Sequence, residues 1–247
     1  MDLSFFYSSD APMVGILSIE HLVYLGVCLF VLCLMIKHYR YVKQEKEKIA
    51  KILFYVLMFQ QIFLLYGWYA IFDQFDISVS LPLHLCRISS ILTLVFLKTK
   101  NKKLLDIIFY FSLFAIGSLF YPKDVYHFMH INGISYMINH LITVAMPVFV
   151  YIAYDWRPSF KGLKSACLWF SIYLVFIYWL NPIIGGNYFY LVNRPFLNNL
   201  TYFQYFIFTF IATYVLYFII YGLYVYIYHK VTKGAKKKAY FAKSMRV

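Results

Sequence analysis

The stretch IEHLVYLGVCLFVLCLMI (residues 19–36), followed directly by KHYRYVKQEKEKIAK (37–51), decides the class of this protein. The first segment has Glu20 as its one fully charged side chain, and a helix needs about 20 apolar residues to cross the hydrocarbon core of a bilayer. The second segment carries six Lys or Arg residues, a flank typical of the cytoplasmic side of a membrane. Together they predict a membrane-spanning helix whose basic end lies inside the cell.

The same apolar pattern recurs six more times along the chain, which predicts seven transmembrane helices. Their expected ranges are 19–36, 52–71, 80–97, 104–121, 133–153, 165–184 and 203–228. Only 13% of the residues are charged, against about 25% in soluble proteins. We therefore expect an all-α polytopic membrane protein, with one transmembrane domain over residues 1–228 and a basic cytoplasmic tail over 229–247.

The connections between these runs alternate in charge, and the alternation sets the orientation. Four segments (37–51, 98–103, 154–164 and the tail) hold 20 of the 23 Lys and Arg residues. By the positive-inside rule the N-terminus lies outside and the C-terminus in the cytoplasm. The net charge of +13 thus sits where it meets anionic lipid. We predict no nucleic-acid partner.

Polar side chains inside the apolar runs mark the candidate site, because each is costly within a bilayer. His84 and Arg87 are three residues apart and so share one helix face. His140 follows Asn139, and Tyr136 lies one helical turn before it on the same face. All five lie in the half of their helices away from the basic loops. This placement predicts a polar pocket that opens outward.

The connections on that outer side add further polar groups. His130 precedes the helix at 133–153, and the loop GGNYFYLVNRP (185–195) contains Asn187 and Arg194. The paired glycines and aromatic residues of this loop predict an ordered capping segment. The expected ligand-binding residues are Arg87, His130, Asn139, Tyr136, Asn187 and Arg194.

Structural interpretations of the same residues stay open. A lone histidine within a membrane often only joins helices by a hydrogen bond, and this applies to His84 and His140. Arg87 can extend its charge to the interface, or pair with Asp73, Asp76 or Asp124.

A histidine-rich zinc site is another alternative for the outer side. His127 and His130 are three residues apart, and either helix histidine would supply a third ligand. No carboxylate accompanies them within a helix, so we predict no metal and no cofactor.

Four motifs carry a resemblance to a known family: LPLHLC (81–86), HIN…Y…NH (130–140), YDWRPS (154–159) and the 185–195 loop. In this order they resemble the YwaF family of bacterial integral membrane proteins, and the resemblance runs over nearly the whole chain. It implies a multi-pass protein of the bacterial cytoplasmic membrane. YwaF-type proteins are largely uncharacterised, so the resemblance indicates a fold more than a function.

The YwaF family is in turn distantly similar to the transmembrane protein 164 group, which is associated with acyl transfer onto phospholipids through a Cys and a His. This similarity implies that His140 matches the histidine. The cysteine aligns with Leu83, so the nucleophile is absent there or displaced to Cys86. A more remote similarity, to androgen-induced-gene-type lipid hydrolases, implies ester hydrolysis.

Three functions are compatible with these features. The first is an acyltransferase or ester hydrolase of the outer leaflet, with His140 as general base, His84 assisting it and Arg87 stabilising an oxyanion or holding a phosphate. The second is a carrier or binding protein for a small polar or lipid ligand. The third is a non-catalytic membrane assembly partner. In each case the expected partners are membrane lipids or an acyl or polar small molecule.

Overall fold

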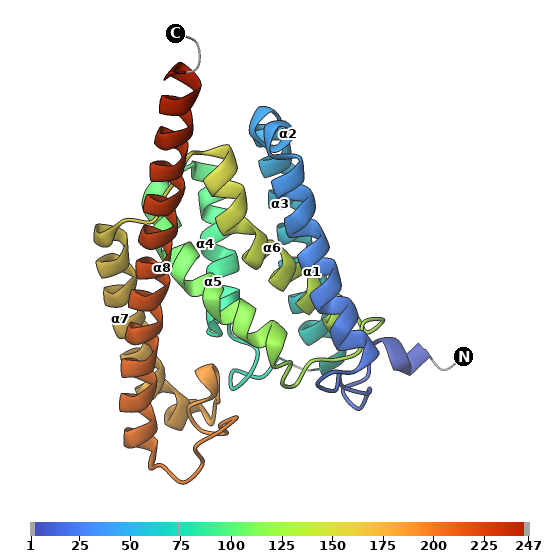
Figure 1. Ribbon diagram of the computed structural model, residues 1–247. Helices are drawn as coiled ribbons and strands as arrows, with labels where there is room; N and C mark the ends of the chain where they lie inside the picture. The colour runs from blue at the N-terminus through green and yellow to red at the C-terminus, as the bar shows by residue number, and fades with distance from the viewer. Residues whose placement is uncertain (1–2, 74, 245–247) are drawn as a thin grey trace.

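The computed structural model describes residues 3–73 and 75–244, and its regular elements within those residues are all helices. The side chains from residue 233 on, which carry most of the basic tail, lie outside this description. The α-helices (Figure 1) are α1 (Ile19–Lys37), α2 (Tyr39–Gln44), α3 (Lys46–Phe59), α4 (Leu85–Thr99), α5 (Leu105–Phe120), α6 (Ile131–Ala153), α7 (Phe160–Ile184) and α8 (Tyr202–Ser244). Short helical turns complete the chain: η1 (Leu3–Phe6), η2 (Gln60–Tyr66), η3 (Tyr69–Asp73), η4 (Lys102–Leu104) and η5 (Tyr188–Tyr190).

Six of the helical segments are long and apolar enough to cross a membrane. They are Ile19–Lys37, Lys46–Phe72, Lys102–Phe120, Ile131–Ala153, Phe160–Ile184 and Tyr202–Thr232. The all-helical prediction is confirmed, and six of the seven expected spans reach spanning length. The seventh, 80–97, does not, because α4 has 15 residues and a length of about 22 Å, short of the roughly 30 Å of a bilayer core.

The expected start of this helix at residue 80 is wrong by five residues, and the local sequence explains why. Pro82 offers no backbone N–H and disfavours the helical conformation of the residue before it. His84 is extended, with φ −70° and ψ 137°, and α4 begins at Leu85. The remainder of the predicted span is therefore an irregular loop that leads into α4.

Three other boundaries also differ from expectation, and the largest difference is at α8, which runs to Ser244 rather than ending at 228. α7 begins at Phe160 rather than 165, because the Ser159 hydroxyl accepts a hydrogen bond from the Gly162 amide (3.0 Å) and caps the helix. The segment expected at 52–71 starts six residues earlier, at Lys46, and ends in two π-helical stretches, η2 and η3. π-Helical turns are uncommon and often lie at functional sites.

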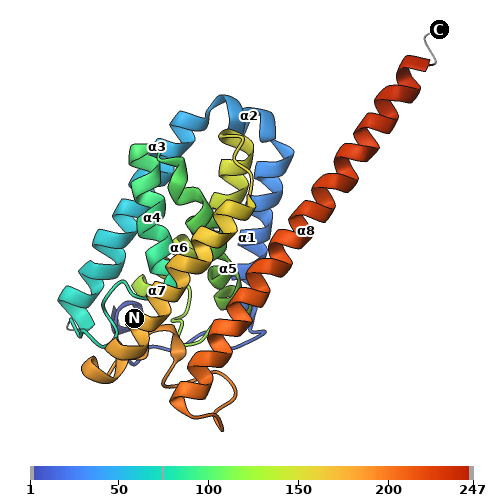
Figure 2. The ribbon, with the colours of Figure 1, turned by 90° about the vertical axis from the view of Figure 1, so that its left-hand side faces the viewer.

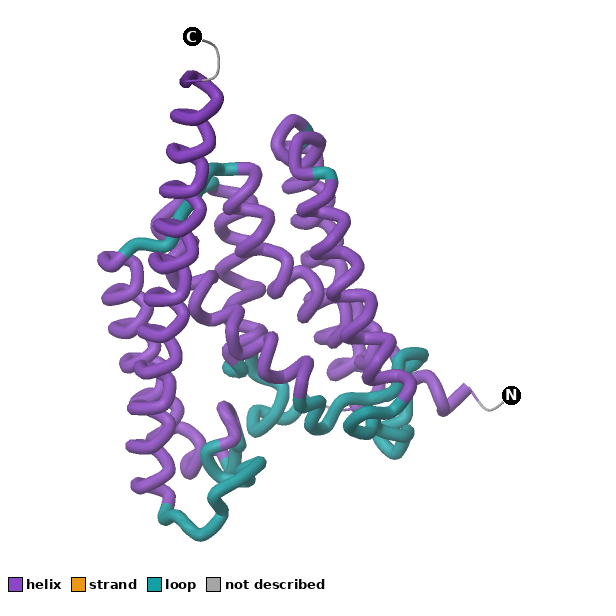
Figure 3. Tube along the Cα trace, in the orientation of Figure 1, coloured by secondary structure: helices purple, strands orange, loops and turns teal. Residues whose placement is uncertain are grey.

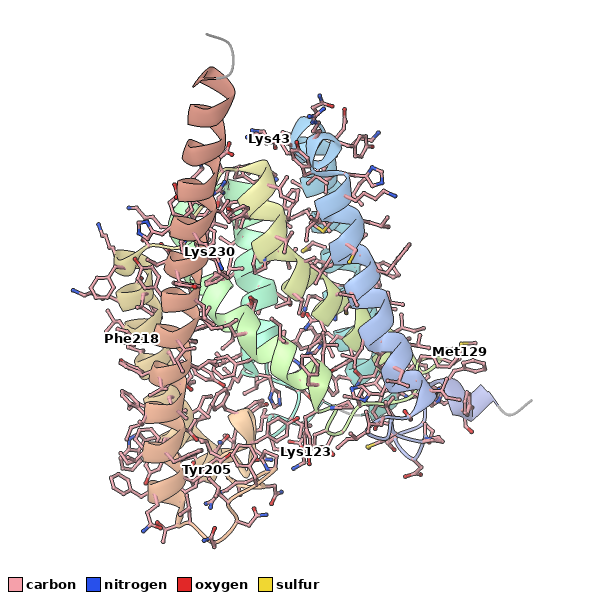
Figure 4. The ribbon with its side chains drawn as sticks, in the orientation of Figure 1. Lys43, Lys123, Met129, Tyr205, Phe218 and Lys230 are labelled. Atoms are coloured by element: carbon pink, nitrogen blue, oxygen red, sulfur yellow. The ribbon has the colours of Figure 1, made fainter. Side chains whose placement is uncertain are left out.

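The two ends of the bundle differ in charge and in loop structure. Lys43 and Lys123 mark opposite ends in Figure 4, and the chain termini also lie at opposite ends in Figure 1. The longer loops gather at the Lys123 end (Figure 3). At the other end the Lys43 ammonium lies 2.8 Å from the Asp155 carboxylate, a contact that lowers the pKa of Asp155. Lys100 also pairs with Glu47 at 3.2 Å and donates to the Tyr154 hydroxyl at 3.1 Å. The basic loops 37–51, 98–103 and 154–164 therefore meet at this end, which we call the basic end.

α5 and α6 form the centre of the bundle, and the other helices surround them. α5 packs against α4, α6 and α7, whereas α8 packs mainly on α7 and leaves the bundle toward its C-terminal end (Figure 2). Large apolar side chains cover the outer surface; Ile19 is 81% exposed, Trp179 68% and Phe218 48%. An apolar exterior of this extent suits contact with lipid.

Gly133, near the start of α6, should be sensitive to substitution. A Cβ at this position would collide with the backbone carbonyls of His127 and Tyr126. We expect Gly133→Ala to lower the free energy of unfolding by about 1–3 kcal/mol, since backbone must shift to make room. Thermal unfolding in detergent measures this.

Gly26→Ala in α1 is the matched control, because a Cβ there meets no atom within 4 Å. It should unfold at or slightly above the wild-type temperature. Equal destabilisation of both variants would contradict the close packing of α6 on the loop before it.

Candidate functional site

A cavity of about 840 Å³ lies at the end of the bundle opposite the basic end, between α4, α5, α6 and α8. Its volume is within the roughly 300–1,000 Å³ typical of small-molecule sites. The sequence-predicted residues in its wall are His84, Arg87, Tyr136, Asn139, His140 and Asn187. The other two, His130 and Arg194, are not part of the wall.

His140 is held in one orientation by its own helix. Its Nδ1 lies 2.9 Å from the Tyr136 carbonyl oxygen, and its ring stacks on the Tyr136 ring with centroids 3.8 Å apart. A carbonyl only accepts, so the neutral ring carries its proton on Nδ1. Nε2 is then an unprotonated acceptor, and it has no partner among the described residues. A fixed histidine with a bare Nε2 has the arrangement of a general base.

Tyr136 is itself fixed, because its hydroxyl donates to the Ser118 carbonyl of α5 at 2.9 Å and lies 3.0 Å from the Ser118 hydroxyl. The sequence placed Tyr136 on the His140 face as a ligand-binding residue. In the structure it also orients the histidine.

Arg87 is held by neutral oxygen atoms rather than by a carboxylate. Its Nη1 lies 3.2–3.4 Å from the carbonyl oxygens of residues 79–81, and Nη2 donates to the Tyr69 hydroxyl at 2.8 Å. Among the side chains that the structure describes, no carboxylate forms an ion pair with it. The alternative in which Arg87 pairs with Asp76 or Asp124 is therefore not the arrangement observed, and the Asp73 side chain lies outside the description. No carboxylate among the described side chains neutralises the guanidinium, which borders the cavity.

His84 and Cys86 lie on the same wall. The His84 ring packs near Tyr188 and Tyr190, with centroid distances of 5.2 and 5.8 Å, and it makes no hydrogen bond to a described residue. Cys86 is half-buried and, like Tyr136, packs against the buried cluster of Cys28, Ala115, Leu119 and Val144. The cavity therefore holds a thiol, two imidazoles and a guanidinium.

A network of hydrogen-bonded polar side chains, which we call the polar ladder, adjoins this wall. It consists of Gln60, Gln61, Ser90, Ser135 and Asn139, and the sequence analysis did not single out its two glutamines. Gln60 donates to the Ser135 hydroxyl at 2.7 Å, and Gln61 donates to Gln60 at 2.9 Å and to the Asn139 amide oxygen at 3.2 Å. Ser90 of α4 also bonds to Asn139. Two glutamines within an apolar run are as costly as the residues that were singled out, so the same criterion would have found them.

The 185–195 loop is ordered, as its sequence predicted, and it lines the cavity at the end opposite the basic end. The Asn181 amide of α7 exchanges two hydrogen bonds with the Tyr188 backbone (2.9 and 3.0 Å), and the Tyr188 side chain is fully buried. Asn187 accepts from two amides of the same loop, so its oxygen is already occupied. Arg194 bonds to the Leu191 and Leu200 carbonyls and stabilises the loop.

The remaining histidines of the outer side have structural partners. His130 caps α6 by accepting from the Asn132 amide at 3.1 Å, and burial lowers the pKa of His130. His127 lies 3.0 Å from the Phe5 carbonyl, and His21 joins α1 to the Leu119 carbonyl at 2.7 Å. No group of three or more His, Cys, Asp or Glu side chains suited to a metal occurs in the described part of the chain. The zinc alternative therefore has no assembled ligand set there.

A model of the TMEM164 family matches residues 16–224. The chain belongs to the TMEM164 family. No curated protein and no solved structure matches it. Of the cavity wall, Met13 alone lies outside the range matched to the TMEM164 family, so the helices and the outer loops that form the site are all within it.

The polar ladder should contribute measurably to the stability of this TMEM164-family chain. Asn139→Ala removes the oxygen that accepts from Gln61 and Ser90, so that Gln61 loses one of its two acceptors and Ser90 keeps its bond to the Cys86 carbonyl. We expect the free energy of unfolding to fall by about 1–3 kcal/mol, measured by denaturant or thermal unfolding in detergent. Asn132→Ala, on the same helix and in the same cavity wall, removes a side chain without a described hydrogen bond and should change stability by less than half as much. Equal losses would contradict the ladder.

Proposed function

We propose that the chain is a membrane enzyme that transfers or hydrolyses an acyl group held in ester linkage on a membrane lipid, with His140 as general base. One observation carries the proposal: Nδ1 of His140 is tied to a backbone carbonyl while its buried Nε2 has no partner, in a cavity that also contains Arg87. The transmembrane protein 164 group is associated with acyl transfer onto phospholipids through a histidine, and this association supports the same proposal.

The reaction needs a nucleophile, a base and a group that stabilises negative charge. Nε2 of His140 takes the proton of a hydroxyl, either water or a lipid alcohol, while the oxygen of that hydroxyl attacks the ester carbonyl. The tetrahedral oxyanion then collapses and the original ester C–O bond breaks. The proton on Nε2 passes to the departing alkoxide, which leaves as an alcohol.

Arg87 and His84 have supporting roles in this mechanism. Because the loop carbonyls fix the guanidinium, its charge is already oriented for an oxyanion or a phosphate before the substrate arrives. The His84 ring makes no hydrogen bond to a described residue and is free to assist with a second proton. Asn139 and Tyr136 position the reacting ester, the ordered Asn187 loop, secured by Arg194, closes the outer end, and His130 caps α6.

Cys86 gives the mechanism a second route. As nucleophile it would form a thioester with the acyl group and release the first alcohol, and a second hydroxyl would then break the thioester and free the thiol. Leu83, which aligns with the family cysteine, has no nucleophilic atom. Cys86→Ala distinguishes the routes, since the direct route retains turnover and the thioester route loses it.

We also propose that the chain is a YwaF-type protein that crosses the cytoplasmic membrane of a bacterial cell seven times. Its N-terminus lies outside and its C-terminus lies in the cytoplasm. The short α4 would complete its crossing with the loop before it, whose carbonyls are paired by Arg87. Irregular backbone is tolerated in a membrane where protein groups satisfy it. The clustering of basic loops at one end supports this orientation.

A carrier and a non-catalytic assembly partner are the competing functions. A carrier would accumulate a ligand in proteoliposomes without changing it. An assembly partner would co-purify with another membrane protein and tolerate loss of His140 once folded. Neither predicts turnover of an ester by the purified chain.

His140→Gln tests the proposed base. Glutamine retains the size and polarity of the side chain but cannot accept a proton at neutral pH, so we expect acyl turnover of phospholipids in vesicles to fall at least 100-fold. His229→Gln, an exposed position on α8, is the control and should retain wild-type turnover. Thermal unfolding of both variants reports on the fold. Wild-type turnover in folded His140→Gln would contradict the assignment.

Labelling of single cysteines in intact cells tests the proposed orientation. In a background without the native cysteines, Lys123→Cys should react with a membrane-impermeant maleimide applied outside. Lys43→Cys should react only after the membrane is permeabilised. The opposite pattern, or labelling of both from one side, would contradict the seven-span arrangement.

A further inference from the structure

The cavity is bordered on one side by apolar residues that are also exposed on the outside of the molecule. Phe208 and Leu216 of α8 are each 38% exposed, Tyr121 at the end of α5 is 48% exposed, and Phe196 in the loop before α8 is 54% exposed. All four line the cavity. A side chain that is both exposed and part of the cavity wall lies at an opening. This opening therefore has an apolar rim.

The opening lies between α5 and α8. Both helices contribute to the cavity wall, yet they make almost no close backbone contact with each other, since α8 packs on α7 instead. Gly117 of α5 and Ala212 of α8 are small, exposed and part of the wall. A Cβ at Gly117 would meet no atom within 4 Å, so the space beside it is free.

Aromatic packing closes the gap toward the basic end. The ring of Tyr217 in α8 lies 4.8 Å from that of Tyr110 and 6.3 Å from that of Phe114, both in α5, and Tyr217 is fully buried. The opening thus extends along α8 from Tyr205 to Tyr217. These twelve helical steps correspond to about 18 Å, close to the roughly 15 Å of one leaflet's hydrocarbon.

We infer that this gap is a lateral portal through which one acyl chain of a bilayer lipid enters the cavity from the leaflet opposite the basic end. The inference deepens the proposed function. It rests on that function only for what happens to the acyl chain once it is bound, namely transfer or hydrolysis of its ester. The portal rim is apolar and faces the hydrocarbon, so a chain passes it without losing contact with apolar surface. The polar groups deeper inside, His140 and Arg87, then lie beyond the rim, where the ester follows its chain.

Photo-crosslinking tests the portal without requiring turnover. The full chain, wild type and His140→Gln, is reconstituted in vesicles that contain phosphatidylcholine with a diazirine midway along one acyl chain. After irradiation, mass spectrometry locates the labelled peptides. We expect label on cavity residues of α5 and α8 that are not exposed outside, such as Leu113 and Thr213, in both proteins.

Bulky substitution at the rim should close the portal. Gly117→Trp and, independently, Ala212→Trp should each reduce the cavity label at least fivefold. Gly222→Trp is the matched control, because Gly222 is an exposed glycine of α8 outside the cavity wall and a Cβ there also meets no atom within 4 Å. It should retain the cavity label. Thermal unfolding identifies any variant that fails to fold. If one rim variant fails to fold, the cavity label of the other rim variant tests the portal.

Turnover separates failure of the portal from failure of the proposed function. If the chain is an esterase, Gly117→Trp should lose at least tenfold with long-chain lipid in vesicles and retain turnover of a short, water-soluble ester. Absence of all turnover would overturn the proposed function, and the labelling would still decide the portal. Cavity label that is unchanged in both rim variants, or label confined to the outer surface at residues such as Phe218, would overturn the portal.

Discussion

Arg87 donates hydrogen bonds to the carbonyl oxygens of Val79, Ser80 and Leu81 and to the Tyr69 hydroxyl. These bonds satisfy both the backbone carbonyls and the guanidinium. The irregular backbone before α4 would leave carbonyls without partners in an apolar surrounding, and a guanidinium would be costly there without acceptors. Tyr188 and Tyr173 satisfy further groups of the same loop, with hydroxyl distances of 2.7 Å to the carbonyls of Ile77 and Leu83. The loop in turn places His84 at the start of α4 and sets the shape of the cavity.

The cavity combines this charged wall with an apolar entrance. On α6, the Tyr136 carbonyl holds His140 so that Nε2 remains without a described partner, and Gln61 of η2 holds Asn139 beside it. On the opposite side, α5 and α8 separate and expose apolar residues at the rim. A substrate with a long apolar part and a polar reacting part fits both sides. Lipid esters have this division, which is why the proposed chemistry and the proposed route of entry agree.

Much of the fold could be predicted from the sequence, because length and charge of apolar runs follow directly from bilayer thickness and the positive-inside rule. Six of the seven expected spans are present. The start of the seventh was wrong, since a run of apolar letters at 80–84 does not reveal that its backbone is extended. The cost of polar groups in a membrane singled out His84, Arg87, Tyr136, Asn139 and His140, and these five line one cavity, whereas their roles stay a prediction. The partners of Arg87 could not be predicted, because backbone carbonyls carry no signature in a sequence. Asn187 was predicted to bind a ligand, whereas its side-chain oxygen accepts hydrogen bonds from its own loop.

The state of the His140 ring tests the central claim most directly. Nitrogen-15 NMR of the imidazole-labelled protein in detergent or lipid, assigned by comparison with His140→Gln, reports which ring nitrogen carries the proton. The structure predicts a neutral ring protonated at Nδ1, with an Nε2 resonance that shifts when a lipid ester analogue is added. A ring protonated at Nε2, or an Nε2 resonance that no lipid ester analogue perturbs, would contradict the account of His140 as the base of a lipid-binding cavity.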